Sequence, residues 1–334
     1  MGRTGWANVV ALVGMLWVFG AACGDDNSGS NRADAAPPAD AAPPDAALFD
    51  AAVREGLWYV MDAIRVPETA MQANQVALDL DGDEQPDNAL GGLLAAMHSS
   101  VDLPIAATQM AAVESGDVLQ LVGIDAASLD DAASVPVLVS RGVDLDGDPA
   151  DNFSGAEGFA LEPLEGADGE LAGSLAAGVL RAGPGTAPIQ LAIFGVTPEV
   201  AAMVGVGARI RANASADGLA GGRYCGAFVD EEVDGVLIPA IAAGLDAILQ
   251  RDCPEAVCEP DTPGEQVSAF FDEDEDGRIT EEELRANSLI ESTIGNPDLD
   301  LFDADGDFNP NVDGVKDSLS LCLGFTAVGA RAYQ

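Results

Sequence analysis

Positive charge is scarce in this chain. Its 334 residues include 57 acidic and only 14 basic side chains, for a net charge of −43, and Lys316 is the only lysine. Because nucleic acids and anionic membrane surfaces are bound through clustered Lys and Arg, the composition excludes nucleic acid as a partner and disfavours an anionic bilayer surface. So many like charges repel one another in a folded chain, which favours bound counter-ions such as divalent cations.

The residue patterns of common catalytic centres are also missing. The sequence contains neither the phosphate-binding pattern G-x-x-x-x-G-K-[S/T] nor the nucleophile pattern G-x-S-x-G, and it has no C-x-x-C pair for zinc. His98 is the only histidine and lies in a helix-like apolar segment, which is typical of a structural role. A carboxylate pair could hydrolyse a glycosidic bond, but 57 acids leave the choice of pair open. We therefore predict a non-enzymatic protein, with a secreted hydrolase as an alternative.

The first 22 residues are predicted to be an export signal. After one basic residue, an uncharged apolar run covers 4–22, and residues 20–23, Gly-Ala-Ala-Cys, resemble the bacterial lipobox, with Gly in place of the usual Leu. An uncleaved transmembrane helix is the alternative, since the run is just long enough to span a bilayer. Residues 24–28 are polar and carry no basic stop-transfer cluster. This favours a lipoprotein lipidated at Cys23, exported to the cell envelope and expected at the outer membrane.

Residues 23–47 are predicted to be an extended tether. The unit Asp-Ala-Ala-Pro-Pro occurs twice, at 34–38 and 40–44, and no large apolar residue interrupts the segment. A segment of this composition cannot bury a core. We expect it to hold the folded part away from the membrane, partly as polyproline II helix.

Residues 48–252 are predicted to form a β-rich domain with helices. Helical spacing predicts helices over 89–101 and 233–249, the second one kinked or restarted at Pro239. The predicted fold class is α+β, predominantly antiparallel β and sandwich-like, with a C-terminal helix–loop–helix and a closing strand. Short apolar runs punctuated by Gly and Pro predict strands at 56–67, 118–124, 135–141, 158–161, 171–180, 188–194, 204–212 and 218–228.

The strongest motif is DEDEDGRITEEE, at residues 272–283. It resembles the EF-hand calcium loop, which takes oxygen ligands from positions 1, 3, 5, 7, 9 and 12 and has an invariant glycine at position 6, here Gly277. Ca²⁺ prefers six to eight hard oxygen ligands, and alternating carboxylates on a tight loop supply them. The resemblance implies Ca²⁺ as the cofactor, held by Asp272, Asp274, Asp276, Arg278 through its main-chain carbonyl, Thr280 and Glu283.

The residues around this loop agree with the motif. Thr262-Pro263-Gly264-Glu265 reads as a capping box at the start of an entry helix, and Thr280–Glu283 repeats the pattern for an exit helix. We therefore assign 253–300 as an EF-hand segment and 301–334 as an acidic loop followed by a closing strand. The apolar run 319–330 is expected to be this strand and to return to the sheet.

Three further loops share the pattern Asp-x-Asp-Gly-Asp. The first resembles the calcium loops of integrin-type FG-GAP repeats, DxDGDGxxD, except that Glu84 replaces their second glycine. An Asp/Gly β-turn is the alternative interpretation of all three. No set of blade repeats follows, so a propeller is rejected. The possible metal ligands are Asp79, Asp81, Asp83 and Asp87 in the first loop, Asp144, Asp146, Asp148 and Asn152 in the second, and Asp303, Asp305 and Asp307 in the third.

Four cysteines remain besides Cys23. An even number in an exported protein predicts two disulfides, with three possible connectivities. We favour Cys253–Cys258, whose members are close in the sequence, and Cys225–Cys322, which would tie the last strand to the sheet.

The chain as a whole also resembles a group of uncharacterised lipoproteins of myxobacteria and their relatives. The shared features are the lipobox, the Asp/Ala/Pro tether and the phrases at 79–94, DLDGDEQPDNALGGLL, and 312–328, VDGVKDSLSLCLGFTAV. The resemblance implies surface attachment and no known activity. We expect a surface lipoprotein whose fold is stabilised by Ca²⁺, attached to the membrane only through its lipid, with a calcium-dependent adhesin for glycan or protein as the alternative. No methionine follows Met203, so a Met-rich calcium sensor is disfavoured.

Overall fold

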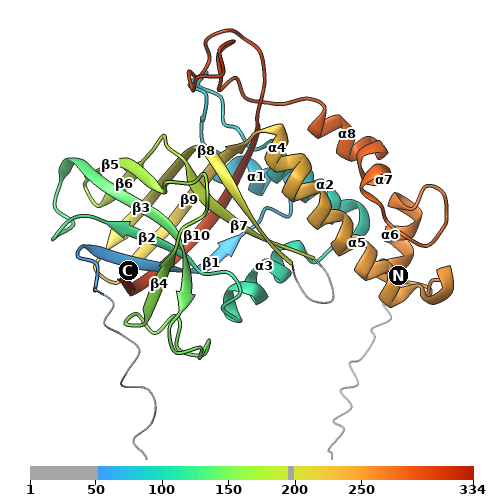
Figure 1. Cartoon of the computed structure of the whole chain (residues 1–334), viewed down its shortest axis with the longest axis horizontal. Helices are drawn as coiled ribbons and strands as arrows, with labels where there is room; N and C mark the ends of the chain where they lie inside the picture. Colours follow the sequence, from blue (N-terminus) through green and yellow to red (C-terminus); the bar gives the residue numbers. More distant parts are fainter. Residues whose placement is uncertain (1–51, 195–198) are drawn as a thin grey trace, which may run out of the picture. The chain divides into compact units, whose positions relative to one another are not determined.

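The computed structural model describes residues 52–194 and 199–334 (Figure 1). The predicted signal at 1–22, Cys23 and the tether at 23–47 lie outside the described residues. The described part combines a large, mostly antiparallel sheet with helices, so the coarse α+β prediction is confirmed.

Ten strands form the β structure. Most of the predicted apolar runs are strands, but 171–180 is a hairpin, because Ala177 and Gly178 adopt positive φ and make a two-residue turn. The strands are β1 (Leu57–Arg65), β2 (Gln120–Ile124), β3 (Ala132–Asp144), β4 (Gly158–Glu162), β5 (Glu170–Ala176), β6 (Val179–Ala182), β7 (Ala187–Ile193), β8 (Glu199–Ser215), β9 (Gly218–Phe228) and β10 (Leu319–Tyr333).

The strand pairings close on themselves. Antiparallel pairs link β1, β2, β3, β5, β6, β8, β9 and β10 in that order, and β10 returns to β1. The short β4 pairs with β3 and, in parallel, with the end of β10, while β7 pairs with β8. The closed circuit replaces the two facing sheets of the predicted sandwich. Long twisted strands allow this closure, because one strand can pair with different neighbours along its length.

Helices cover part of the sheet and gather beside it (Figure 1). The predicted helix at 233–249 lies within a continuous helical segment, 230–252, in which a π-helical turn, Val233–Leu237, precedes Pro239, a residue with no N–H to donate to the preceding turn. The α-helices are α1 (Ala70–Val76), α2 (Ala89–Val101), α3 (Ile105–Glu114), α4 (Asp230–Glu232), α5 (Ile238–Asp252), α6 (Pro263–Phe271), α7 (Glu281–Ala286) and α8 (Ser288–Ile294).

One bent pair is the nearest approach to a membrane span. Among the described residues no single helix is long and apolar enough to cross a membrane, and only α2 and α3 taken together, bent by 111°, reach that length and hydropathy.

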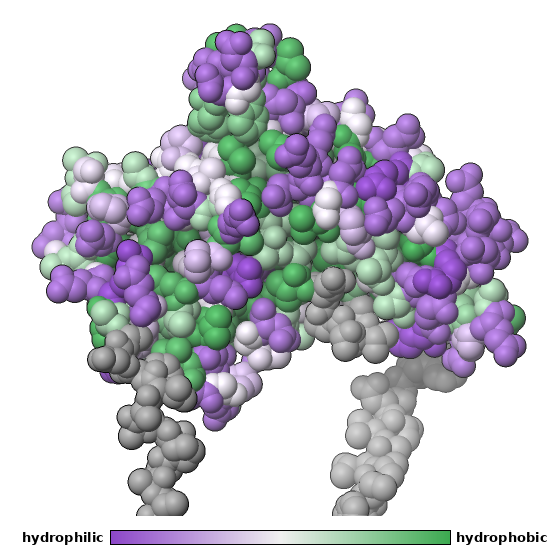
Figure 2. Space-filling model, viewed as in Figure 1, coloured by the Kyte–Doolittle hydropathy of each residue, from purple (hydrophilic) through white to green (hydrophobic). Residues whose placement is uncertain are grey.

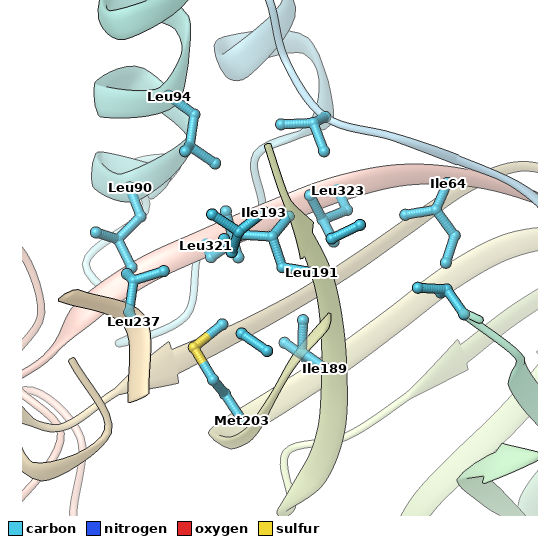
Figure 3. Packing of buried hydrophobic residues seen from close by; sticks show 14 of the residues in the cluster. Ile64, Leu90, Leu94, Ile189, Leu191, Ile193, Met203, Leu237, Leu321 and Leu323 are labelled. Carbon is cyan, nitrogen blue, oxygen red and sulfur yellow. The ribbon is translucent and has the colours of Figure 1, made fainter. Parts of the chain in front are cut away.

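The main core lies between the sheet and the helices. Figure 3 shows Leu90 and Leu94 of α2 beside Ile193 of β7 and Leu321 and Leu323 of β10. Elements far apart in the sequence therefore share one apolar layer. The acidic loops lie at the ends of these strands and helices. The packing of the core therefore sets the positions of the loops.

Both predicted disulfide pairings are present. Cys225 of β9 and Cys322 of β10 are register partners with a sequence separation of 97, and both are fully buried. Cys253 and Cys258 close a short loop between α5 and α6, with a sequence separation of 5.

Candidate metal centre

The loop 272–283 lies between two capped helices. Thr262 caps α6 by accepting the N–H of Glu265, and Thr280 caps α7 by accepting the N–H of Glu283. The capping box predicted at 280–283 is complete, because the Glu283 carboxylate also accepts the N–H of Thr280. Local sequence thus determines where both helices begin. Hydrophilic side chains cover the side of the molecule that carries α6 and α7 (Figure 2).

Three of the six predicted ligands come together in this loop. Asp272, Asp274 and Asp276 each place a carboxylate oxygen within 4.8 Å of the other two. Asp272 is only 8% exposed and accepts the N–H groups of Asp276 and Gly277, each at 3.1 Å. Asp276 accepts the N–H of Arg278 at 2.8 Å. The loop therefore holds a cluster of hard oxygen donors, which fits a divalent cation such as Ca²⁺.

The basic side chain within this loop is engaged elsewhere, although its charge also acts on Asp276. Arg278 is the nearest basic residue in the sequence, but its guanidinium forms two bonds, of 2.8 and 2.9 Å, to Asp246 of α5. Within the described residues no Lys or Arg forms an ion pair with Asp272, Asp274 or Asp276. A bound metal ion would supply the missing positive charge.

The other three predicted ligands are placed differently. Glu283 lies outside the three-carboxylate group, and its second oxygen accepts the N–H of Glu273 at 3.1 Å. The Thr280 hydroxyl donates to Glu283 at 2.9 Å. The side chain of Arg278 faces Asp246, which leaves only its main-chain carbonyl, the predicted donor, for a metal.

Gly277 connects this loop to the short disulfide. Its φ of +79° favours glycine, and a Cβ there would lie 2.8 Å from Cβ of Ala256, which is inside the Cys253–Cys258 loop. The Gly277 carbonyl accepts Nε2 of Gln250 on α5 at 2.6 Å. The candidate metal loop is therefore packed against α5 and the disulfide loop.

The first Asp-x-Asp-Gly-Asp loop also assembles three carboxylates. Asp79, Asp81 and Asp87 approach within 4.8 Å, whereas Asp83 accepts the N–H of Gln85 and lies outside the group. The side chain of Asp81 is completely buried and forms an ion pair of 3.0 Å with Lys316. In Figure 1 this loop lies beside the dark-red segment that precedes β10. The only lysine of the chain thus already offers one positive charge to this cluster.

Asp87 has a strongly perturbed acidity. Burial raises the pKa of its carboxyl to about 7, and the carboxylates of Asp81, Asp298 and Asp83 add to the rise, while the N–H of Leu80 opposes it. Near neutral pH, Asp87 is therefore partly protonated, which lowers the negative charge of this site.

We expect Asp87 to make the metal-free protein less stable as the pH rises from about 4 to 7. In this window the folded state keeps a proton that the unfolded chain, with an ordinary pKa of 3.8, has lost. The stabilisation is fully present below the unfolded pKa and is lost as pH passes the folded pKa. With chelator present, the free energy of unfolding of the wild type minus that of Asp87→Asn should fall across this window and level off above it.

The Asp305→Asn variant is the matched control, because it removes one exposed carboxylate that does not act on the pKa of Asp87. A wild-type-minus-Asp87→Asn difference that stays constant from pH 4 to 7 contradicts the assignment.

The second loop recruits a residue that the sequence analysis missed. Asp144 and Asp146 approach Glu157 within 4.8 Å, Asp148 lies outside this group of carboxylates, and the predicted ligand Asn152 is buried. Glu157 immediately precedes β4, and the pairing of Asp144 with Phe159 brings it back to the loop. Desolvation, Asp146 and Glu157 raise the pKa of the neighbouring Asp151. No local pattern marks Glu157, because its position depends on the register of β3 and β4.

The third loop binds its own backbone. Asp303 accepts the N–H groups of Asp305 and Asp307, each at 3.1 Å, and these bonds lower the pKa of its carboxyl. Asp303, Asp305 and Asp307 form no three-carboxylate group within the described residues. The arrangement is that of an Asp/Gly turn, the alternative considered for all these loops.

His98 has a structural partner. Its Nδ1 lies 2.7 Å from the main-chain carbonyl of Leu103, which follows the C-terminal end of α2. The histidine therefore connects the end of a helix to the next turn, as expected for a structural role.

Known proteins provide no guide to the activity. Comparison of the chain with protein-family models, with curated proteins and with solved structures finds no match in any of the three. A function must therefore be argued from the carboxylate clusters and the surfaces themselves.

Proposed function

We propose that this chain is a calcium-binding, non-enzymatic lipoprotein of the cell envelope whose fold is stabilised by Ca²⁺. The observation that carries the proposal is the EF-hand-type loop, in which three aspartates converge between two capped helices. Asp272, Asp274 and Asp276 would hold the ion, and the Arg278 carbonyl, Thr280 and Glu283 are the remaining expected donors. The groups of the first two acidic loops are further candidate sites.

The donor chemistry favours calcium over magnesium. All the gathered ligand atoms are carboxylate oxygens, which both ions accept. Mg²⁺ demands near-ideal octahedral geometry and usually keeps several waters, whereas Ca²⁺ tolerates the irregular shells that one loop provides. A single 12-residue loop rich in Asp is therefore better suited to Ca²⁺.

The disulfides support an exported protein. Disulfides persist in oxidising compartments and are rare in the cytosol. Together with the predicted signal at 1–22 and the lipobox cysteine Cys23, the pairs Cys225–Cys322 and Cys253–Cys258 favour a location in the cell envelope. Extracellular calcium modules work with dissociation constants of about 10⁻⁴–10⁻³ M, so such a site would be filled constantly rather than switched.

The expected stabilisation is modest for each site. At a calcium concentration ten times the dissociation constant, one site adds about 1.4 kcal/mol to the free energy of unfolding. Occupied sites add together, and a typical domain is stable by only about 5–15 kcal/mol. Calcium at two or three clusters would also remove repulsion between neighbouring carboxylates.

Thermal unfolding with and without calcium tests this proposal. Calcium should raise the melting temperature by about 3 °C for each filled site, and chelator should reverse the rise. Magnesium at the same concentration is the control and should raise it less. A melting temperature that neither calcium nor chelator changes contradicts the structural role.

A further inference from the structure

Four arginines form a row across the outer face of the sheet. In the strand register Arg181 of β6 is opposite Arg211 of β8, and Arg211 is opposite Arg223 of β9. The row continues through Gly324 of β10 to Arg65 of β1. Directly paired residues of antiparallel strands point to the same face, and strands lie about 4.8 Å apart, so Arg181 and Arg223 are about 10 Å apart along the row.

This row points away from the core. The residues next to Arg181, Arg211 and Arg223 in their strands, such as Leu180, Ala212 and Tyr224, are buried on the inner face. Arg181, Arg211 and Arg65 are exposed, and Arg223 is half-buried. The alternation of strand side chains therefore places the guanidinium groups on the surface.

In the part of the chain that the structure describes, these arginines form no ion pair with a carboxylate. Ion pairs of the described residues involve Arg141, Arg251, Arg278, Arg285 and Lys316, and none includes a member of the row. Arg223 donates to the carbonyl of Ala77 at 3.3 Å. Like charges directly opposite each other destabilise a sheet. The row therefore concentrates positive charge on one surface of a chain with 57 acids, which favours an anionic ligand there.

A groove accompanies one end of the row. It has a volume of about 550 Å³ and is lined by Arg181 and Arg211 together with Arg209, Ser134 and Ser174. Arg209 lies on the same strand as Arg211 and donates to the Leu80 carbonyl at 3.2 Å. Ser174 is the register partner of Arg181, so its hydroxyl lies in the same row. The volume is that of a small-ligand site.

The opposite end of the row is a separate surface. Arg65 and Arg223 line a different cavity, of about 470 Å³, together with Gly324 of the row and Val76 of α1. A ligand in the groove is therefore limited to the side with Arg181, Arg209 and Arg211. Asp79 also lines the groove and disfavours an anion beside it, and its carboxylate accepts the N–H groups of Gly82 and Glu84.

We propose that this groove binds a short acidic oligosaccharide, with Arg181, Arg209 and Arg211 holding its carboxylate groups and Ser134 and Ser174 its hydroxyls. Guanidinium groups bind carboxylates through paired hydrogen bonds, and Arg181, Arg209 and Arg211 lie on two neighbouring strands, so together they can hold more than one carboxylate of the same ligand. This ligand-binding function goes beyond the structural role of calcium.

Other anionic ligands fit the groove less well. Proteins bind single-stranded nucleic acid by stacking its bases on aromatic side chains, and none of the residues lining this groove is aromatic. A bilayer surface needs a broad basic face, whereas this site is a groove that Asp79 also lines. Serine hydroxyls and guanidinium groups together match a ligand that is both charged and rich in hydroxyls.

Binding of end-labelled tri-galacturonate to the full-length protein, followed by fluorescence anisotropy at low and moderate salt, tests the proposal. Arg211→Gln should weaken binding by about tenfold or more, since it removes charge-assisted hydrogen bonds. Arg331→Gln is the matched control, because it removes the same charge from an exposed arginine of β10 that does not line the groove. It should change the affinity by less than about twofold.

Other outcomes overturn the proposal. Absence of tri-galacturonate binding, or an equal loss in the Arg211→Gln and Arg331→Gln variants, excludes this groove as the site. Equally tight binding of neutral tri-galactose shows that the carboxylates are not recognised. Equally tight binding of oligo(dT) or tripolyphosphate shows that the groove selects phosphate anions rather than acidic sugars. A melting temperature of Arg211→Gln equal to that of the wild type confirms that any loss concerns binding and not folding.

Discussion

The double variant Asp274→Asn/Asp276→Asn should lose the tightest calcium-binding event while keeping the folded loop. Both substitutions leave one oxygen for the N–H that each side chain accepts, from Asp276 and from Arg278. They remove two of the three negative charges that converge within 4.8 Å. Because Ca²⁺ affinity depends on the number of charged oxygen ligands, we expect calorimetric titration to lose one site and calcium to raise the melting temperature by about 3 °C less than in the wild type.

A matched variant separates this effect from a general change in charge. Asp305→Asn/Asp307→Asn alters the net charge equally, in an exposed loop whose aspartates do not gather. It should leave the tightest event unchanged. With chelator present, the first variant should be at least as stable as the wild type, since repulsion between the carboxylates is relieved. Identical titrations of wild type and Asp274→Asn/Asp276→Asn would rule out calcium binding at this loop.

Removing the disulfide between Cys225 and Cys322 should be the most destabilising change in the chain. The bond closes a loop with a sequence separation of 97. Such a cross-link lowers the conformational entropy of the unfolded chain and so stabilises the folded protein by about 4–5 kcal/mol. It also joins β9 to β10, and β10 is the strand that closes the circuit by pairing with β1. We expect Cys225→Ala/Cys322→Ala to lose about this free energy of unfolding in urea, close to the whole stability of a weak domain.

The second disulfide provides the comparison. Cys253 and Cys258 are separated by only 5 positions, so the same relation gives about 2 kcal/mol for their removal. Cys253→Ala/Cys258→Ala should therefore remain folded and lose less than half as much stability. The loop closed by Cys253 and Cys258 packs on Gly277. Calcium binding should therefore weaken more in Cys253→Ala/Cys258→Ala than in the folded fraction of Cys225→Ala/Cys322→Ala. Equal losses of stability would contradict the loop-entropy argument.

Local sequence patterns predicted much of the helical and loop structure. Thr262 and Thr280 are followed by Glu three positions later, and the structure caps α6 and α7 at these residues. Alternating aspartates with a glycine after the third predict a tight loop, and Asp272, Asp274 and Asp276 do converge. These features depend on hydrogen bonds between near neighbours, which a sequence pattern shows directly.

Long-range pairings were much harder to predict. The run 171–180 was expected as one strand and is a hairpin, because Ala177 and Gly178 turn with positive φ. The sandwich prediction was replaced by a closed circuit that depends on β10 pairing with β1, residues far apart in the sequence. Strand periodicity defines which face is buried but not which strand is the neighbour.

The amino-acid sequence by itself determined the acidic character of this protein, the capped helices, the acidic loop at 272–283 and the short cysteine pair Cys253–Cys258, because each depends on composition or on nearby residues. Only the tertiary structure decided which charges meet. The register of β3 and β4 brings Glu157 to the second acidic loop, and folding brings Lys316 to Asp81. The register of β6, β8 and β9 aligns Arg181, Arg211 and Arg223 in one row. Coulomb interactions depend on distance in space, and strand register, which sequence spacing does not reveal, sets those distances.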